Sequence, residues 1–174
     1  MSKALLEDLE RAIRQRNPTL AQRLRPGLPE SRIRKMMAER DIAGVIDPIV
    51  ALFAWKNGSR LDPKITLEQS SPFPASIYTF MDLEMMIQDF IGFKEVGAYH
   101  PKYTEVVDRY FPIFWDGSTG YLALDLEPSG HNRVVLLDPE SEAFVSQAYL
   151  SFEEFLKDAI RANEENDRLK CFKY

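Results

Sequence analysis

Apolar side chains recur every three or four positions through the first third of the chain, and this spacing predicts amphipathic helices. The first helix begins at Ser2 and ends at Asn17, because Pro18 disfavours the α conformation in the residue before it. A short helical turn over residues 20–24 and a longer helix over residues 29–41 follow. The N-terminal part of the chain is therefore expected to be helical.

The stretch LFAWKNG predicts a helix that ends at a corner of the fold. Asp47 caps this helix, and Pro48 occupies its first helical position. Asn57 and Gly58 tolerate positive φ and are typical residues at the end of a helix. Trp55, in the last turn, has two interpretations: an anchor for a partner, or an aromatic plug that closes the end of the core. We favour the plug and expect the indole to be mostly buried.

The second half of the chain changes to the alternation of strands. Residues 76–81 predict a strand, and Asp82 caps a helix that continues through Ile91. Turns rich in Asp, Gly, Pro and Ser then separate a series of further strands. These predicted strands cover residues 110–115, 120–126, 133–138 and 143–150.

A last helix closes the pattern. It begins at Ser151, and Glu154 three residues later makes a capping box with it. Phe155 belongs to the apolar stripe of this helix. Segregated helices and strands imply the α+β class, and we predict a single domain with helices packed on a mixed, mostly antiparallel sheet.

Composition and charge narrow the classes of function. The 174 residues are 45% hydrophobic and 28% charged, which is typical of a soluble globular domain. No apolar run reaches the ~20 residues that a membrane span needs, and the N-terminal segment lacks the uninterrupted apolar stretch of a signal peptide. The single cysteine, Cys171, fits a reducing compartment, so a cytoplasmic protein is expected. A formal net charge of −5 argues against nucleic acid as the main partner.

No motif indicates catalytic chemistry. His100 and His131 are the only histidines and lie in predicted loops, while Cys171 lies in a predicted tail. The sequence contains no glycine-rich phosphate loop, no serine elbow and no His/Cys cluster with metal-ligand spacing. We therefore expect a protein that is not an enzyme and that needs neither a metal nor a cofactor.

The order and spacing of several motifs resemble the SUKH superfamily of Smi/Knr-type domains. LRPGLPESRIRKMMAERDIAGVIDPIVALFAWKNG resembles the opening of these domains, and YTFMDLEMM resembles their strand-to-helix step. YFPIFWDGSTGYLALDL resembles their Phe-Pro and Asp-Gly hairpin, and SFEEFLKDAI their closing helix. The resemblance covers roughly residues 24–161, which leaves residues 1–23 as an N-terminal helical extension and 162–174 as a C-terminal tail. The positions that carry structural parts of the pattern are Pro48, Trp55, Asn57, Gly58, Pro112, Gly117, Ser151 and Phe155.

This resemblance implies binding rather than chemistry. Bacterial SUKH domains are largely immunity proteins that neutralise a polymorphic toxin, commonly a nuclease, whereas eukaryotic relatives are regulatory interaction modules. The resemblance thus implies an immunity protein that occludes a protein toxin, a basic nuclease being one candidate. A regulatory or scaffolding module without a toxin partner is the alternative. Neither nucleic acid nor a membrane is expected as a partner.

Carboxylates and aromatic residues interleave along the predicted strands and turns of the C-terminal half. For any one of these residues, solvated charge at a sheet edge or the needs of a tight turn would explain its identity. As a set they could present acidic and aromatic contacts to a basic partner. The predicted partner-binding residues are Trp115, Asp116, Tyr121, Asp125, Asp138 and Tyr149.

Overall fold

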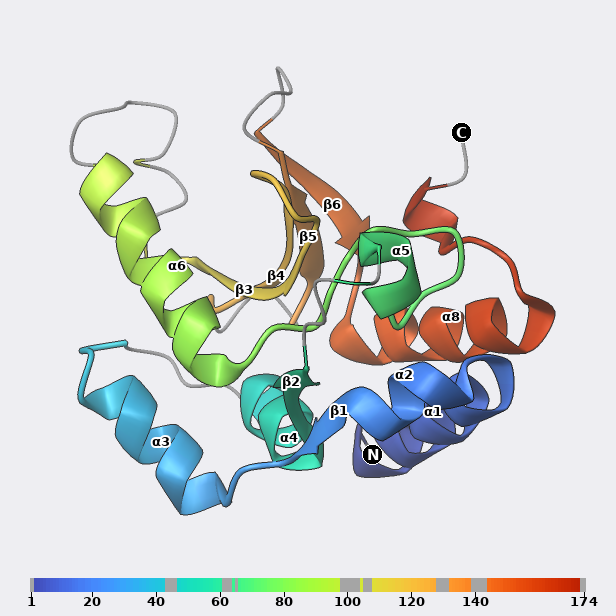
Figure 1. Cartoon of the computed structure of the whole chain (residues 1–174). Helices are drawn as coiled ribbons and strands as arrows, with labels where there is room; N and C mark the ends of the chain where they lie inside the picture. Colours follow the sequence, from blue (N-terminus) through green and yellow to red (C-terminus); the bar gives the residue numbers. More distant parts are fainter. Residues whose placement is uncertain are drawn as a thin grey trace.

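The chain forms two antiparallel sheets surrounded by helices, as the computed structural model shows (Figure 1). The predicted α+β class is confirmed. The structure describes residues 2–42, 47–60, 64, 66–97, 104, 108–127, 132–138 and 144–172. The helices are α1 (Ser2–Arg16), α2 (Pro18–Arg23), α3 (Glu30–Ala38), α4 (Asp47–Trp55), α5 (Leu67–Ser70), α6 (Leu83–Gly97), α8 (Phe152–Glu165) and the 3₁₀ turn η2 (Lys170–Phe172). The strands are β1 (Leu24–Pro26), β2 (Lys56–Ser59), β3 (Tyr110–Trp115), β4 (Tyr121–Asp125), β5 (Val134–Leu137) and β6 (Val145–Tyr149).

The larger sheet has the strand order β3-β4-β5-β6, and β1 pairs with β2 in a separate small sheet. All pairs between the described strands are antiparallel. The predicted strand at residues 76–81 is wrong, because this segment contributes only one bridge, in which Thr79 and Trp115 exchange both backbone hydrogen bonds. The carbonyl group of Phe80 instead accepts hydrogen bonds from the backbone and hydroxyl of Ser59 in β2. The segment therefore joins the two sheets.

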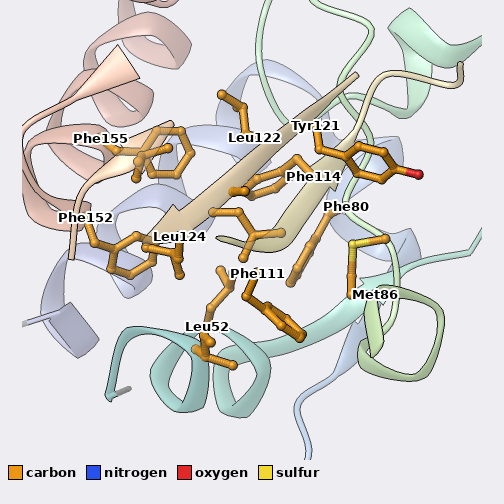
Figure 2. Packing of buried hydrophobic residues seen from close by; sticks show 14 of the residues in the cluster. Leu52, Phe80, Met86, Phe111, Phe114, Tyr121, Leu122, Leu124, Phe152 and Phe155 are labelled. Carbon is orange, nitrogen blue, oxygen red and sulfur yellow. The ribbon is translucent and has the colours of Figure 1, made fainter. Parts of the chain in front are cut away.

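Helices pack around the larger sheet from several directions (Figure 1). In this view α6 lies on one side of the sheet, while α8, α1 and α2 lie together on the other. An aromatic core fills the space between these layers, and Figure 2 shows Phe80, Phe111, Phe114 and Phe155 converging there. The ring centroids of Phe80 and Phe114 lie 5.1 Å apart, and those of Phe114 and Phe155 lie 5.8 Å apart. Segments far apart in sequence therefore share one core. Within the described residues, no helix is long and apolar enough to cross a bilayer.

Both ends of the described chain belong to this core. Leu6, Leu9 and Ile13 of α1 are buried in the same cluster as Leu169 near the C-terminus. Helix α8 continues to Glu165, past the predicted end of the family-like region at residue 161. The predicted boundaries of an extension and a tail therefore mark no break in the packing.

Two residues of the predicted corner have different roles from those expected. Helix α4 ends at Trp55, and Asn57 and Gly58 lie in β2 rather than in a helix cap. The side-chain oxygen of Asn57 accepts the N–H of Leu83, the first residue of α6, at 3.0 Å. Gly58 has φ of 76° as expected, and a Cβ atom there would come within 2.6 Å of the backbone nitrogen of Asp82. The corner is thus a junction between β2 and the start of α6.

Trp55 is half-buried, so the expectation of a mostly buried indole is only partly met. Its ring stacks on Phe80, with centroids 6.2 Å apart and planes 20° apart. The indole Nε1 donates a hydrogen bond to the carboxylate of Glu10 at 3.2 Å. The indole therefore closes the core at the end of α4 while keeping one edge at the surface.

Two prolines and a glycine of the family-like pattern lie where their backbone preferences predict. Pro48 follows Asp47 at the start of α4 and is buried. Pro112 lies in β3, at the edge of the larger sheet and next to an irregularity in the register, where a strand tolerates the loss of an N–H donor. Gly117 has φ of 88° in the turn between β3 and β4.

The capping of α8 differs in detail from the predicted capping box. The hydroxyl of Ser151 accepts the N–H of Glu154 at 3.1 Å, as expected for an N-cap. The carboxylate of Glu154 accepts the N–H of Leu150 at 2.9 Å, one residue before the donor of a standard box. Phe155 is fully buried and faces the core.

Candidate functional site

Four of the six predicted partner-binding residues lie at one end of the larger sheet. Tyr121, the first residue of β4, pairs with both Trp115 and Leu137. Asp116 follows Trp115 into the β3–β4 turn, and Asp138 follows Leu137 at the same end of the neighbouring strand. We call this part of the molecule, residues 115–121 with Asp138, the turn end of the sheet.

Asp125 lies at the opposite end of the sheet and is fully buried, with 0% of its surface exposed. Its carboxylate accepts hydrogen bonds from Arg133 at 2.7 Å, from Arg109 at 3.2 and 3.3 Å, and from the N–H of Glu127 at 3.0 Å. Burial by itself raises the pKa of Asp125, but the hydrogen bonds from these groups outweigh it and hold the pKa below its usual value. The prediction that Asp125 offers its charge to a partner is therefore wrong.

Tyr149 also lies away from the turn end and is only 4% exposed. Its hydroxyl donates a hydrogen bond of 2.7 Å to Asp158 of α8. Asp158 also accepts the N–H of Lys170 at 2.7 Å and a hydrogen bond from Arg161 at 2.8 Å. Tyr149 therefore connects β6 to α8 and the C-terminal segment, and the prediction of an exposed anchor is wrong.

At the turn end, Trp115 and Asp116 are partly exposed and shape the turn itself. The carboxylate of Asp116 accepts the N–H groups of Ser118 at 2.8 Å and Gly120 at 3.0 Å. The indole of Trp115 donates to the carbonyl oxygen of Ser118 at 2.9 Å. These bonds hold the turn in one conformation and leave the side chains of Ser118 and Thr119 exposed.

Asp138, the fourth predicted residue at this end of the sheet, is half-buried. Its backbone N–H donates a hydrogen bond to the carbonyl oxygen of Phe144 at 2.9 Å.

A cleft of about 280 Å³ opens between α6 and the turn end. Tyr121 is the one predicted partner-binding residue among the described residues that line it. One wall comes from α6 and the other from the β3–β4 turn and the start of β4. The lining residues are Gln88, Asp89, Gly92, Phe93, Val96, Ser118, Thr119 and Tyr121.

The cleft combines an aromatic corner with a half-buried carboxylate. The rings of Phe93 and Tyr121 meet edge to face, with centroids 5.2 Å apart and planes at 87°. Figure 2 shows the hydroxyl group of Tyr121 pointing away from the other labelled core side chains. This hydroxyl hydrogen-bonds to Asp89. Burial raises the pKa of Asp89 above its usual value, and the Tyr121 hydrogen bond opposes this only in part.

Sequence reasoning missed Asp89. It assigned α6 a single apolar face, whereas Asp89, Phe93 and Val96 form a second stripe at spacings of four and three residues. The available signal was a carboxylate directly before the apolar residues Phe90 and Ile91 of this helix. Its contact with Tyr121, 32 positions away in the sequence, depends on the packing of α6 against the larger sheet.

Trp55 borders a second groove, of about 460 Å³, between α1, α3 and α4. Its apolar lining includes Val50, Ala51 and Ala54. Charged residues surround this lining, and on the α3 side Arg34 pairs with Glu30, one turn earlier in the same helix, at 2.8 Å. Trp55 therefore packs on the core and also faces a groove.

The described residues offer little for nucleophilic or metal chemistry. Among them, no group of three or more His, Cys, Asp or Glu side chains is placed to hold a metal ion. His100 and His131 lie outside the described residues. Cys171 lies in η2, where burial raises the pKa of its thiol to about 11. A thiol with this pKa stays protonated at neutral pH and is a poor nucleophile.

No family model matches the chain, and no curated protein matches it at a significant level.

Proposed function

We propose that this protein is a non-catalytic immunity protein that neutralises a cognate polymorphic toxin by direct contact in the cytoplasm. The proposal extends the resemblance of its motifs to SUKH domains. The observation that carries it is the turn end of the sheet, where partly exposed Trp115 and Asp116 lie beside the aromatic, acidic cleft. Aromatic side chains are enriched among the residues that dominate protein–protein binding energies.

The charge of the protein supports a basic partner. The net charge of −5 attracts cationic proteins over distances of about one Debye length, ~8–10 Å at physiological salt. Because Asp125 is neutralised inside the fold, the acidic groups available near the proposed surface are those of the turn end and the cleft. A basic nuclease domain is a partner of this kind.

The test first searches the genes that neighbour this protein's own for one that encodes a toxin domain. That domain is then co-expressed with this protein, and survival of the host cell is scored. Thr119→Arg places a bulky cation on the exposed tip of the turn, where the proposed contact occurs. Thr19→Arg is the matched control, because it makes the same exchange at an exposed position of α2. We expect wild type and Thr19→Arg to protect the cell and Thr119→Arg to lose protection while keeping its melting temperature.

Two results would count against the proposal. Failure of the wild-type protein to bind or neutralise the toxin removes the immunity function and favours a regulatory module. Full protection by Thr119→Arg shows that another surface, such as the groove beside Trp55, makes the contact.

A further inference from the structure

We propose that the cleft between α6 and the turn end receives the guanidinium group of an arginine side chain on a protein partner. The inference rests on the proposed function, since the arginine would belong to the toxin. It deepens that function by naming the chemical group that the cleft recognises.

The charge of the cleft is the first argument. Asp89 is the one charged side chain among the described residues that line it. Its carboxylate receives a hydrogen bond from Tyr121, and a carboxylate can accept several more. A bound cation would supply the opposite charge that a half-buried carboxylate otherwise lacks.

The lysine of α6 is engaged elsewhere. Lys94, on the same helix, forms an ion pair with Asp108, and its Nζ lies 5.4 Å from the centroid of the Phe90 ring. Arg109, which pairs with Asp125, lies toward the opposite end of the larger sheet. Among the described residues that line the cleft, none offers Asp89 a positive charge, so a cation from another molecule can take that position.

The aromatic corner favours guanidinium over ammonium. The ring planes of Phe93 and Tyr121 are at 87° to each other. A planar group that stacks on one of these rings therefore directs its edge toward the other ring. Guanidinium is planar, stacks on aromatic rings and is less strongly hydrated than ammonium. It also donates two parallel hydrogen bonds to a carboxylate, which ammonium cannot do.

The size of the cleft fits a side chain rather than a larger ligand. Its volume of about 280 Å³ lies below the roughly 300–1,000 Å³ of typical small-molecule sites. Gly92 leaves room in the helix wall, because a Cβ atom built there meets no heavy atom within 4 Å. The exposed hydroxyl groups of Ser118 and Thr119 provide a polar rim on the opposite wall.

The experiment titrates the full-length protein with capped arginine, N-acetyl-arginine N-methylamide, and follows backbone amide shifts by NMR. Capped citrulline, which has the same shape without the charge, and capped lysine are the comparison ligands. We expect arginine to bind with a dissociation constant of about 1–10 mM, as for a single charge-assisted contact. The largest shifts should fall on residues 88–96 and 118–121.

Three variants test the role of the cleft. Asp89→Asn keeps an oxygen for Tyr121 but removes the charge, and should weaken arginine binding by about fivefold or more. Glu95→Gln, an exposed carboxylate on the same helix, should change it less than about twofold. Gly92→Leu fills the open space in the wall and should abolish binding without lowering the melting temperature.

Each contrary result overturns the inference. Equal binding of citrulline removes the role of charge, and equal binding of lysine removes the preference for guanidinium. Unchanged affinity in Asp89→Asn, or shifts confined to other parts of the chain, places the site elsewhere. These results are separate from the co-expression test: loss of protection by Thr119→Arg without arginine binding would keep the proposed function and remove the arginine pocket.

Discussion

Two glycines show how the surroundings of a single residue decide its contribution. Gly58 has positive φ, and its missing Cβ lets β2 approach the backbone of Met81 and Asp82. Gly92 lies inside helix α6, and a Cβ atom there would meet open space. The same residue type is required at the first position and costs helix stability at the second.

We expect Gly92→Ala to raise the free energy of unfolding by about 0.5–1 kcal/mol, because alanine has the higher helix propensity. Gly58→Ala should lower it by more than about 1 kcal/mol, because the new Cβ is strained by φ and by contact with backbone. Urea denaturation of both variants measures the difference. Destabilisation by Gly92→Ala would mean that the wall of the cleft is filled rather than open.

Trp55 is expected to stabilise the fold even though it also borders a groove. Trp55→Ala should cost about 2–3 kcal/mol, less than for a fully enclosed ring, because it removes the stacking on Phe80 and the bond to Glu10. Trp55→Phe keeps a ring against Phe80 and should cost about half as much. Thermal and urea denaturation report both values. Wild-type stability of Trp55→Ala would instead favour a role in partner binding alone.

At the scale of elements, the start of α6 depends on a residue from another element. Asp82 accepts the N–H of Met85 at 2.9 Å, which is ordinary capping within one segment. Asn57 of β2 accepts the N–H of Leu83 and so satisfies a second free donor of the same helix. The small sheet therefore fixes the position of the helix that forms one wall of the cleft.

Asn57→Ala should destabilise the protein by about 1–2 kcal/mol, because it leaves the Leu83 N–H without an acceptor. Asn57→Asp keeps an oxygen acceptor and places negative charge near the helix N-terminus, so it should retain most of the stability. Hydrogen exchange at the Leu83 amide measures the effect directly and should be faster in Asn57→Ala. Unchanged exchange at Leu83 would contradict the capping role of Asn57.

At the scale of the whole molecule, two buried carboxylates join distant segments. Asp125 binds Arg109 and Arg133 at one end of the larger sheet. Asp158 connects β6, α8 and the C-terminal segment through Tyr149, Arg161 and Lys170. For both aspartates, burial acts to raise the pKa, but their hydrogen bonds lower it overall.

These lowered pKa values predict loss of stability in acid. A carboxylate whose pKa is lower in the folded than in the unfolded state stabilises the fold fully above the unfolded pKa of about 3.9. This contribution is lost as the pH falls through the folded pKa. The melting temperature should therefore drop steeply below about pH 4.

Asp158→Asn should lower the melting temperature at pH 7 and flatten the decline in acid, since the substituted residue no longer titrates. Asp89→Asn is the control, because the pKa of Asp89 is raised and its removal should not flatten the decline. Thermal denaturation between pH 7 and pH 2.5 distinguishes the two. An equally steep decline in Asp158→Asn would assign the acid sensitivity to other carboxylates.

The local elements of this protein could be predicted from the sequence because their signals lie within a few residues of one another. The helix at Ser151 follows from its cap and apolar stripe, and the strands from Tyr110 onward follow from alternation and turn residues. Hydrogen bonds in a helix join residues four apart, so pattern and structure share one length scale. The α+β class followed from the order of these elements.

The environment of each candidate site residue was decided by tertiary structure alone. Asp116 and Asp125 are both acidic residues at strand ends, yet one remains partly exposed in a turn and the other is enclosed between two arginines. Asp89 gained its contact with Tyr121 only when α6 packed against the larger sheet. Periodicity determines which face of an element is apolar, but it carries no information about which distant charge will lie opposite a carboxylate. The pairing of the carboxylate with such a charge decides whether the carboxylate is buried in the fold or available to a partner.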